Sequence, residues 1–197
     1  YRLLCWNISI DLINIDLSAQ FFVHLRASVA AGLILSFPFI IMEIWKFVAP
    51  ALYAGEKRAL RLAFLLSTVL FYLGVLVGYF VVLPLCLQFF INYTVSTEVV
   101  NTISLGSYMS MFTSMVLLNG LVFEFPTVML ALSRLGVVDR AALRRGRKYA
   151  FVAILIVAAL ITPADPVSMF VLAIPMYLLY EFSILLCSSQ KKPASGE

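Results

Sequence analysis

A single carboxylate lies in a short basic segment between two apolar stretches of the chain. Glu56 follows the residues Lys-Phe-Val-Ala-Pro-Ala-Leu-Tyr-Ala-Gly, which begin at Lys46, and the bases Lys57, Arg58 and Arg61 come after it. A carboxylate can accept two parallel, charge-assisted hydrogen bonds from one arginine guanidinium. The segment is therefore a candidate site for an arginine side chain of another molecule. The alternative is a solvated ion pair between Glu56 and a neighbouring base, which would contribute little to stability.

Apolar side chains precede this carboxylate in the sequence. Phe47, Leu52 and Tyr53 lie within ten residues of Glu56. They are expected to cover a bound guanidinium, and the lower local dielectric would strengthen its hydrogen bonds to the carboxylate. These four residues form the predicted binding site.

A second carboxylate lies inside an apolar stretch. Glu124 stands between two phenylalanines and two residues before Pro126. A charged acid deep in a membrane costs about 3 kcal/mol, so Glu124 is expected to face protein or water, or to carry a proton. At about 100° per residue it shares a helix face with three hydroxyl side chains, Ser110, Thr113 and Ser114. Two roles stay open: a hydrogen-bonded group that holds the fold, or a docking point or protonatable switch for a partner helix.

The other acids and the histidine indicate no catalytic or metal site. Asp165 is predicted to cap a turn, Glu181 to pair with a basic loop residue, and Glu43 to pair with Lys46 or to reach the interface. His24 is the only histidine in the sequence, and no cysteine or carboxylate cluster has metal-ligand spacing. No phosphate-binding loop or nucleophile motif is present. We therefore expect a protein that is not an enzyme and that needs no metal or cofactor.

The composition is that of a membrane protein. Hydrophobic residues make up 63% of the 197 residues and charged residues 12%, and the mean hydropathy is +1.03. A span requires about 20 mainly apolar residues. The sequence predicts one all-α membrane domain, a helical bundle whose five spans cover residues 22–48, 63–91, 108–135, 150–161 and 167–187. Residues 1–21 would form an external segment and residues 188–197 a cytoplasmic tail.

Prolines lie inside four of these spans, at Pro38, Pro84, Pro126 and Pro175. Each removes a backbone donor and clashes with the preceding turn, so the helices are expected to bend and to enclose a concave surface. The fourth span is too short, at about 1.5 Å per residue, for a hydrocarbon layer of about 30 Å. Either its basic flank extends the helix or the bilayer thins there.

Basic residues gather on one side of the predicted spans. The segment 134–148 holds six bases against Asp139, the segment 46–61 holds four, and Lys191 and Lys192 follow the last span. The positive-inside rule places these segments and the C-terminus in the cytoplasm. This topology, together with anionic lipid, accounts for the net charge of +4 without a nucleic-acid partner.

Several short motifs occur in a distinctive order between residues 16 and 186. They are Phe37-Pro38, Trp45-Lys46-Phe47, Pro50-Ala51-Leu52-Tyr53, Glu56-Lys57-Arg58, Phe71-Tyr72-Leu73-Gly74, Tyr79-Phe80 with Pro84, Phe123-Glu124-Phe125-Pro126, Arg147-Lys148-Tyr149, Thr162-Pro163-Ala164-Asp165 and Ala173-Ile174-Pro175-Met176-Tyr177. In this order they resemble the TatC family, the polytopic subunit of the twin-arginine protein translocase. The family often has glutamine where this sequence has Glu43.

The resemblance implies a receptor for signal peptides with consecutive arginines and a core scaffold for the export of folded proteins by the proton-motive force. It implies small single-span partners of the TatA and TatB type, docking against the third to fifth spans, in an oligomeric complex in a bacterial plasma membrane. It also implies a preceding cytoplasmic segment and a first span that this sequence lacks. Because that segment would supply a second acidic contact, we expect the fragment to bind such peptides weakly.

Two other functions are consistent with the residues alone. A proton-coupled small-molecule transporter could use Glu124 as its relay, although such transporters show inverted repeats or paired broken helices. A membrane assembly factor without a transport role is the third possibility. Cross-linking of a twin-arginine peptide to the segment around Glu56 would separate the three.

Overall fold

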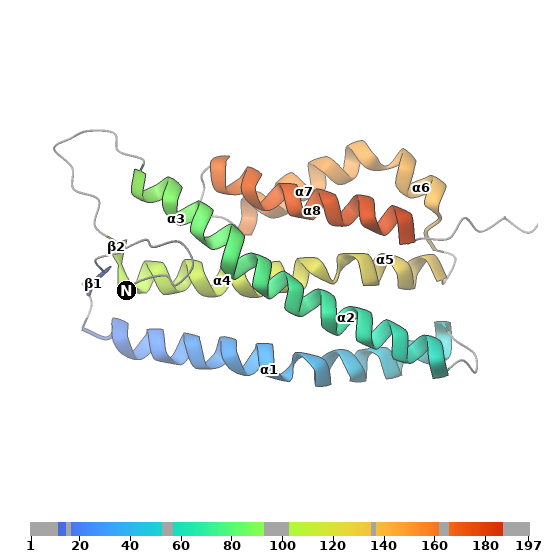
Figure 1. Ribbon diagram of the computed structural model, residues 1–197, viewed down its shortest axis with the longest axis horizontal. Coiled ribbons are helices and arrows are strands. Elements are labelled where there is room, and N and C mark those ends of the chain that lie inside the picture. The colour runs from blue at the N-terminus through green and yellow to red at the C-terminus, as the bar shows by residue number, and fades with distance from the viewer. Residues whose placement is uncertain are drawn as a thin grey trace, which may run out of the picture.

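The computed structural model describes residues 12–14, 17–52, 57–92, 103–134, 137–161 and 166–186, which are almost entirely helical (Figure 1). Two short strands pair in parallel, β1 (Leu12–Ile13) with β2 (Ile103–Ser104). The helices are α1 (Ala19–Leu52), α2 (Lys57–Val77), the π-helix η1 (Gly78–Val82), α3 (Leu83–Asn92), α4 (Leu105–Phe123), α5 (Phe125–Arg134), α6 (Arg140–Arg145), α7 (Arg147–Ile161) and α8 (Pro166–Leu186).

The helices run roughly along the long axis of the molecule (Figure 1). The rod formed by α4 and α5 lies between α1 on one side and α7 and α8 on the other. The rod formed by α2, η1 and α3 crosses obliquely, so that α2 packs on α1 and α3 packs on α8. One end of the molecule contains the end of α1, the start of α2, the end of α5, all of α6 and the end of α8. The predicted basic segments lie within or next to these parts of the chain.

Three helical stretches are long and apolar enough to cross a membrane: Ala19–Phe47, Arg61–Asn92 and Leu105–Arg134. Met169–Leu185 forms a shorter apolar helix. They correspond to the first, second, third and fifth predicted spans. The predicted fourth span corresponds to α7, which has 15 residues. The predicted fold class, an all-α polytopic membrane protein, is confirmed, while the number of spans stays a prediction.

Prolines interrupt two of the rods. Pro84 cannot donate to the carbonyl four residues earlier, and the chain forms the π-helix η1 directly before it. Pro126 lies just after the break between α4 and α5. In contrast, α1 continues past Pro38 and α8 continues past Pro175. The predicted bends therefore coincide with a π-helical turn before Pro84 and with a break in the helix before Pro126.

Glycines allow α2 and α4 to approach closely. A Cβ added to Gly74 would lie 2.7 Å from the carbonyl oxygen of Asn119, and one added to Gly120 would lie 2.8 Å from the ring of Phe71. Small residues at such contacts let backbones pack tightly where lipid supplies no hydrophobic driving force. Larger side chains at Gly74 or Gly120 would therefore push α2 and α4 apart.

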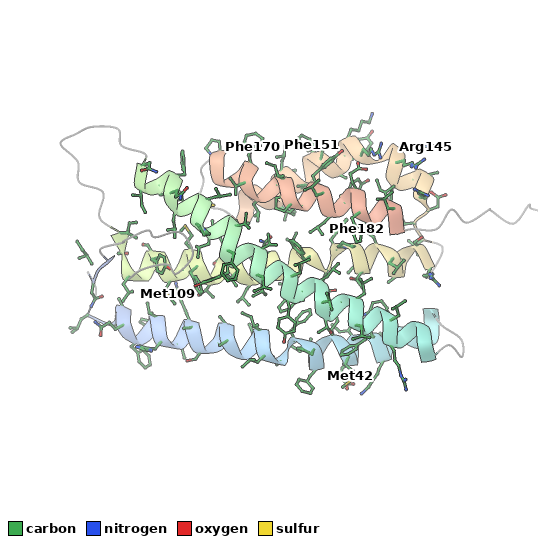
Figure 2. All side chains as sticks on the ribbon, viewed as in Figure 1. Met42, Met109, Arg145, Phe151, Phe170 and Phe182 are labelled. Atoms are coloured by element: carbon green, nitrogen blue, oxygen red, sulfur yellow. The ribbon has the colours of Figure 1, made fainter. Side chains whose placement is uncertain are left out.

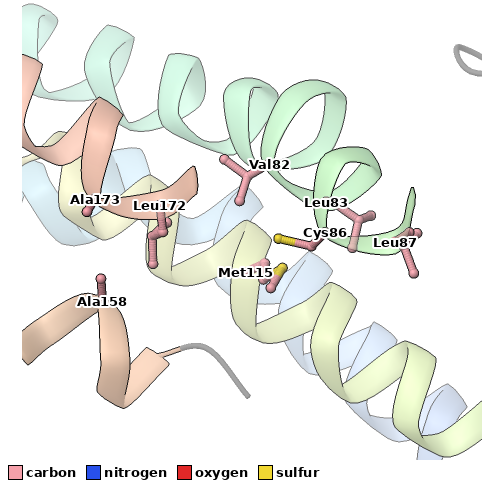
Figure 3. Packing of buried hydrophobic residues seen from close by; sticks show 8 residues of the cluster. All are labelled: Val82, Leu83, Cys86, Leu87, Met115, Ala158, Leu172 and Ala173. Atoms are coloured by element: carbon pink, nitrogen blue, oxygen red, sulfur yellow. The ribbon is translucent and has the colours of Figure 1, made fainter. Parts of the chain in front are cut away.

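Buried side chains form three clusters. The largest joins α3, α4, α7 and α8 (Figure 3) and contains Val82, Leu83, Cys86, Leu87, Met115, Ala158, Leu172 and Ala173. A second joins α1 to α2 and contains Phe37, Ile41, Trp45, Ala63 and Phe71. A third joins α6 to α8 and contains Leu143, Tyr180 and Ile184.

Large apolar side chains also cover the outside of the molecule. Phe151, Phe170 and Phe182, labelled in Figure 2, are exposed on α7 and α8, and α1 exposes a long series of phenylalanines and aliphatic residues. Such an apolar exterior is typical of a surface that faces lipid. The structure is thus that of a multi-pass membrane protein.

Candidate functional site: the Glu124 cleft

The predicted guanidinium site lies mostly outside the described residues. Glu56 and Tyr53 are outside them, and Leu52 is described only as the last residue of α1. Phe47 is 88% exposed near the end of that helix. Next to it, Lys46 Nζ lies 2.7 Å from Glu43 Oε1 in a solvent-exposed ion pair. The role of Glu56 therefore stays a prediction.

A buried hydrogen bond fixes α1 just before this segment. The indole Nε1 of Trp45 donates to Ser67 Oγ of α2 across 3.0 Å. Two turns earlier in α1, the rings of Phe37 and Phe71 stack with their centroids 3.4 Å apart. The last turns of α1 are thus held against α2 by both apolar and polar contacts.

Glu124 occupies the break between α4 and α5. Its N–H donates to the carbonyl of Leu121, and its own carbonyl accepts from the N–H groups of Thr127 and Val128, each at 3.0 Å. Pro126 has no N–H to continue the ladder of α4, so the chain starts a new helix here. The break fixes the acid at the junction of two helices rather than on a regular helix face.

The carboxylate is buried but incompletely satisfied. Glu124 is 8% exposed, and Ser67 and Thr127 are close enough to interact with its side chain. Oε1 of Glu124 and Oγ1 of Thr127 nevertheless have no hydrogen-bond partner. A buried polar atom without a partner carries a desolvation cost, and such atoms are uncommon in folded proteins. Glu124 therefore has capacity to accept a further hydrogen bond.

A cleft of about 440 Å³ opens beside Glu124 between the α4–α5 rod and the helices α7 and α8. Its lining comprises Leu118, Leu121, Val122, Glu124, Phe125, Val128, Ala150, Ala153, Ile154, Val157, Met176 and Tyr180. Among these described lining residues, Glu124 has the only acidic side chain. The hydroxyl of Tyr180 is already engaged, since it donates to the carbonyl of Leu143 across 2.7 Å. The cleft is an apolar surface with one unsatisfied carboxylate in its wall.

Thr113 and Ser114 lie on α4, the helix that ends at Glu124, and their role in docking stays a prediction. They lie eleven and ten residues before Glu124, about 15 Å away at 1.5 Å per residue. Thr113 Oγ1 is buried without a partner. The hydroxyl side chains close enough to interact with the carboxylate are Ser67 and Thr127. The periodicity of one helix could not reveal Ser67, because it comes from a different helix.

Asn119 is a further buried polar residue that the sequence analysis missed. It is fully buried on α4, and neither amide atom of its side chain has a hydrogen-bond partner. Its side chain faces η1, since a Cβ on Gly78 would lie 3.1 Å from the Cβ of Asn119. The α2–α4 contact thus contains unsatisfied polar groups at two levels, Asn119 and Glu124.

Two other acidic residues make contacts near the ends of α6, α7 and α8. Glu181 Oε2 lies 2.8 Å from Arg147 Nη2, and Glu181 Oε1 accepts from the hydroxyl of Tyr177. Asp139 caps α6 by accepting from the N–H of Ala142. Asp165 lies outside the described residues. Within the described part of the chain, no group of three or more His, Cys, Asp or Glu side chains could hold a metal ion.

Comparison with known proteins identifies close relatives of this chain. Residues 2–175 match the family model of the Sec-independent protein translocase protein TatC. The proteins of that name from Desulforapulum autotrophicum and Aquifex aeolicus are 38% and 37% identical, over 88% and 90% of this chain. The chain covers 64% of the Desulforapulum protein and 74% of the Aquifex protein. It spans 66% of a third relative, from a Blattabacterium, so it is shorter than the curated relatives it matches.

The fold also matches a solved structure. The crystal structure of the twin-arginine translocase receptor TatC in DDM superposes with a TM-score of 0.82 at 36% sequence identity. The match covers 91% of this chain and 80% of that chain.

Proposed function

The chain belongs to the TatC family of translocase proteins, as its motifs predict, and on this basis we propose that it serves as the signal-peptide receptor and core scaffold of a twin-arginine translocase. In this function it exports folded proteins across an energised membrane by using the proton-motive force. The family is one of translocase proteins rather than enzymes, and membership favours this function over a small-molecule transporter. The likeness to a twin-arginine translocase receptor is the observation that supports the proposal most strongly.

The signal peptide is proposed to bind at the hairpin after α1. Glu56 would accept the paired guanidinium groups, with Phe47, Leu52 and Tyr53 as apolar cover. The exposed ring of Phe47 supports this role, because it offers apolar contact area at the end of the molecule where basic residues gather. The pairing of Lys46 with Glu43 supports it as well, since this nearby base already has an acidic partner.

Small single-span subunits of the TatA and TatB type are proposed to dock in the Glu124 cleft. The apolar lining suits the side of a membrane helix, and the unpartnered Oε1 of Glu124 suits a polar hydrogen-bond donor on that helix. A donor in the cleft would remove the desolvation cost of this oxygen. Several copies would assemble around such contacts into an oligomeric complex.

We place the protein in a bacterial plasma membrane with its basic end in the cytoplasm. Arg61, Arg134 and the bases of α6 lie at the same end of the structure as the end of α8. The positive-inside rule then assigns that end, and with it the C-terminus, to the cytoplasm.

Photo-cross-linking of a twin-arginine peptide tests the proposed function in membranes that contain the protein and its partners. A probe replacing Phe47 is expected to cross-link the peptide, and a probe replacing Phe39, another exposed phenylalanine of α1, is not. A peptide in which lysines replace the two arginines is expected to cross-link at about one tenth of the yield of the twin-arginine peptide. Lysine lacks the planar guanidinium group that can donate two parallel hydrogen bonds to a carboxylate. Equal yields at both positions, or with both peptides, would contradict the proposal.

A further inference from the structure

A buried polar bridge connects α1 to the Glu124 cleft through α2. The indole of Trp45 donates to Ser67 Oγ, and both side chains are buried. Ser67 also lies close enough to Glu124 to interact with its side chain. A serine hydroxyl can accept one hydrogen bond while it donates another. Ser67 can therefore accept from Trp45 and donate to the carboxylate of Glu124 at the same time.

The two ends of this bridge belong to different surfaces of the protein. Trp45 is followed by the exposed residues Lys46 and Phe47, which lead into the proposed signal-peptide hairpin. Glu124 lines the cleft that is proposed for a partner helix. Three side chains thus connect the two proposed binding surfaces.

Packing around the bridge restricts independent movement of its members. One turn from Ser67, the ring of Phe71 stacks on Phe37 of α1. A Cβ added to Gly120, which lies one turn before Glu124, would be 2.8 Å from the same ring. In such close packing, a shift of the end of α1 must either carry Ser67 with it or break the bond from Trp45.

We propose that Ser67 is a positioning residue that transmits the position of Trp45 to the carboxylate of Glu124, and so couples the hairpin to the cleft. While Trp45 donates to Ser67, the serine hydroxyl is oriented and its proton is directed to Glu124. When the bond from Trp45 is lost, the hydroxyl can rotate and Glu124 loses a fixed donor. The coupling to docking rests on the proposed function, whereas the bridge itself does not.

Infrared spectroscopy of the Glu124 carboxyl band tests the bridge in the purified protein. The band is assigned by its loss in Glu124→Gln. Trp45→Phe, which keeps an aromatic ring but removes the donor, and Ser67→Ala are each expected to shift the band. Trp45→Phe is expected to add no further shift in the Ser67→Ala background, because the effect passes through that hydroxyl.

The matched control is Ser183→Ala. It removes another buried hydroxyl, which donates within α8 to the carbonyl of Leu179, and it is expected to leave the Glu124 band in place. A band that Trp45→Phe does not move, or shifts from Trp45→Phe and Ser67→Ala that simply add, would overturn the bridge.

Cross-linking from the cleft tests the coupling to docking. A photo-reactive probe at Val128, on the cleft wall, reports contact with a partner helix with and without saturating twin-arginine peptide. The peptide is expected to change the yield about fivefold in the unsubstituted protein and in Ser183→Ala, but less than about twofold in Ser67→Ala. If the peptide still changed the cross-linking yield about fivefold in Ser67→Ala, the coupling would be overturned. If the unsubstituted protein cross-links neither peptide nor partner, the proposed function fails, and the infrared result still decides the bridge.

Discussion

The hydroxyl of Tyr180 donates a hydrogen bond to the backbone carbonyl of Leu143, with 2.7 Å between the two oxygens. The bond joins α8 to the short helix α6, and both residues are buried in the same cluster. Tyr180 also lines the cleft, so this contact fixes one cleft wall to the basic end of the molecule.

Replacement of Tyr180 by phenylalanine is expected to lower the free energy of unfolding by about 1 kcal/mol, because it leaves a buried carbonyl without its donor. Thermal unfolding in detergent measures the change. Tyr149→Phe is the matched control, since Tyr149 is 70% exposed, and it is expected to have almost no effect. Equal stability of the two variants would show that the Tyr180 bond contributes nothing.

Gly120→Ala is expected to destabilise the protein by about 1–3 kcal/mol, because the new Cβ would lie 2.8 Å from the ring of Phe71 and would force α2 and α4 apart. Gly32→Ala serves as the control. A Cβ there meets no atom within 4 Å, and alanine favours a helix over glycine by about 1 kcal/mol. The same unfolding measurement should therefore move in opposite directions for the two variants. A shift in the same direction would argue against close α2–α4 packing.

Glu124→Leu is expected to leave stability unchanged or to raise it, because it removes a buried oxygen that has no partner. Export of a twin-arginine substrate is expected to fall about tenfold or more, because the cleft loses its hydrogen-bond acceptor. Unfolding in detergent and export from cells measure the two effects separately. Normal export by Glu124→Leu would leave Glu124 as a packing residue.

Glu56→Lys is expected to reduce cross-linking of a twin-arginine peptide about tenfold or more, because it replaces the acceptor of the guanidinium groups by a like charge. Glu43→Lys is the control with the same charge change, since Glu43 pairs with Lys46 on the exposed surface of α1. It is expected to reduce cross-linking far less. Equal loss in both variants would indicate a general effect of surface charge rather than a site at Glu56.

The sequence alone predicts much of this fold. Apolar stretches of sufficient length indicate the helices, and the predicted span 63–91 lies within the continuous rod from Lys57 to Asn92. The family could be predicted from motifs in a fixed order, which the match over residues 2–175 confirms. Apolar length and motif order are properties of contiguous residues, so a single sequence contains them.

The parts that the sequence does not predict depend on contacts between distant segments. The strands β1 and β2 have two residues each and pair across about ninety positions, which leaves no periodic pattern to detect. Ser67 and Glu124 come from different helices, so the periodicity of a single helix could not reveal that they lie close together.

The π-helix η1 affects how the rod formed by α2, η1 and α3 packs against α1 and α8. A wider turn inserts an extra residue, which changes the rotational phase of everything that follows by about 100°. The face of α2 that carries Phe71 is directed at α1, whereas Leu83, Cys86 and Leu87 beyond the π-helix join the cluster with Leu172 and Ala173 of α8. The local unwinding thus lets one membrane-length rod hold the two halves of the molecule together.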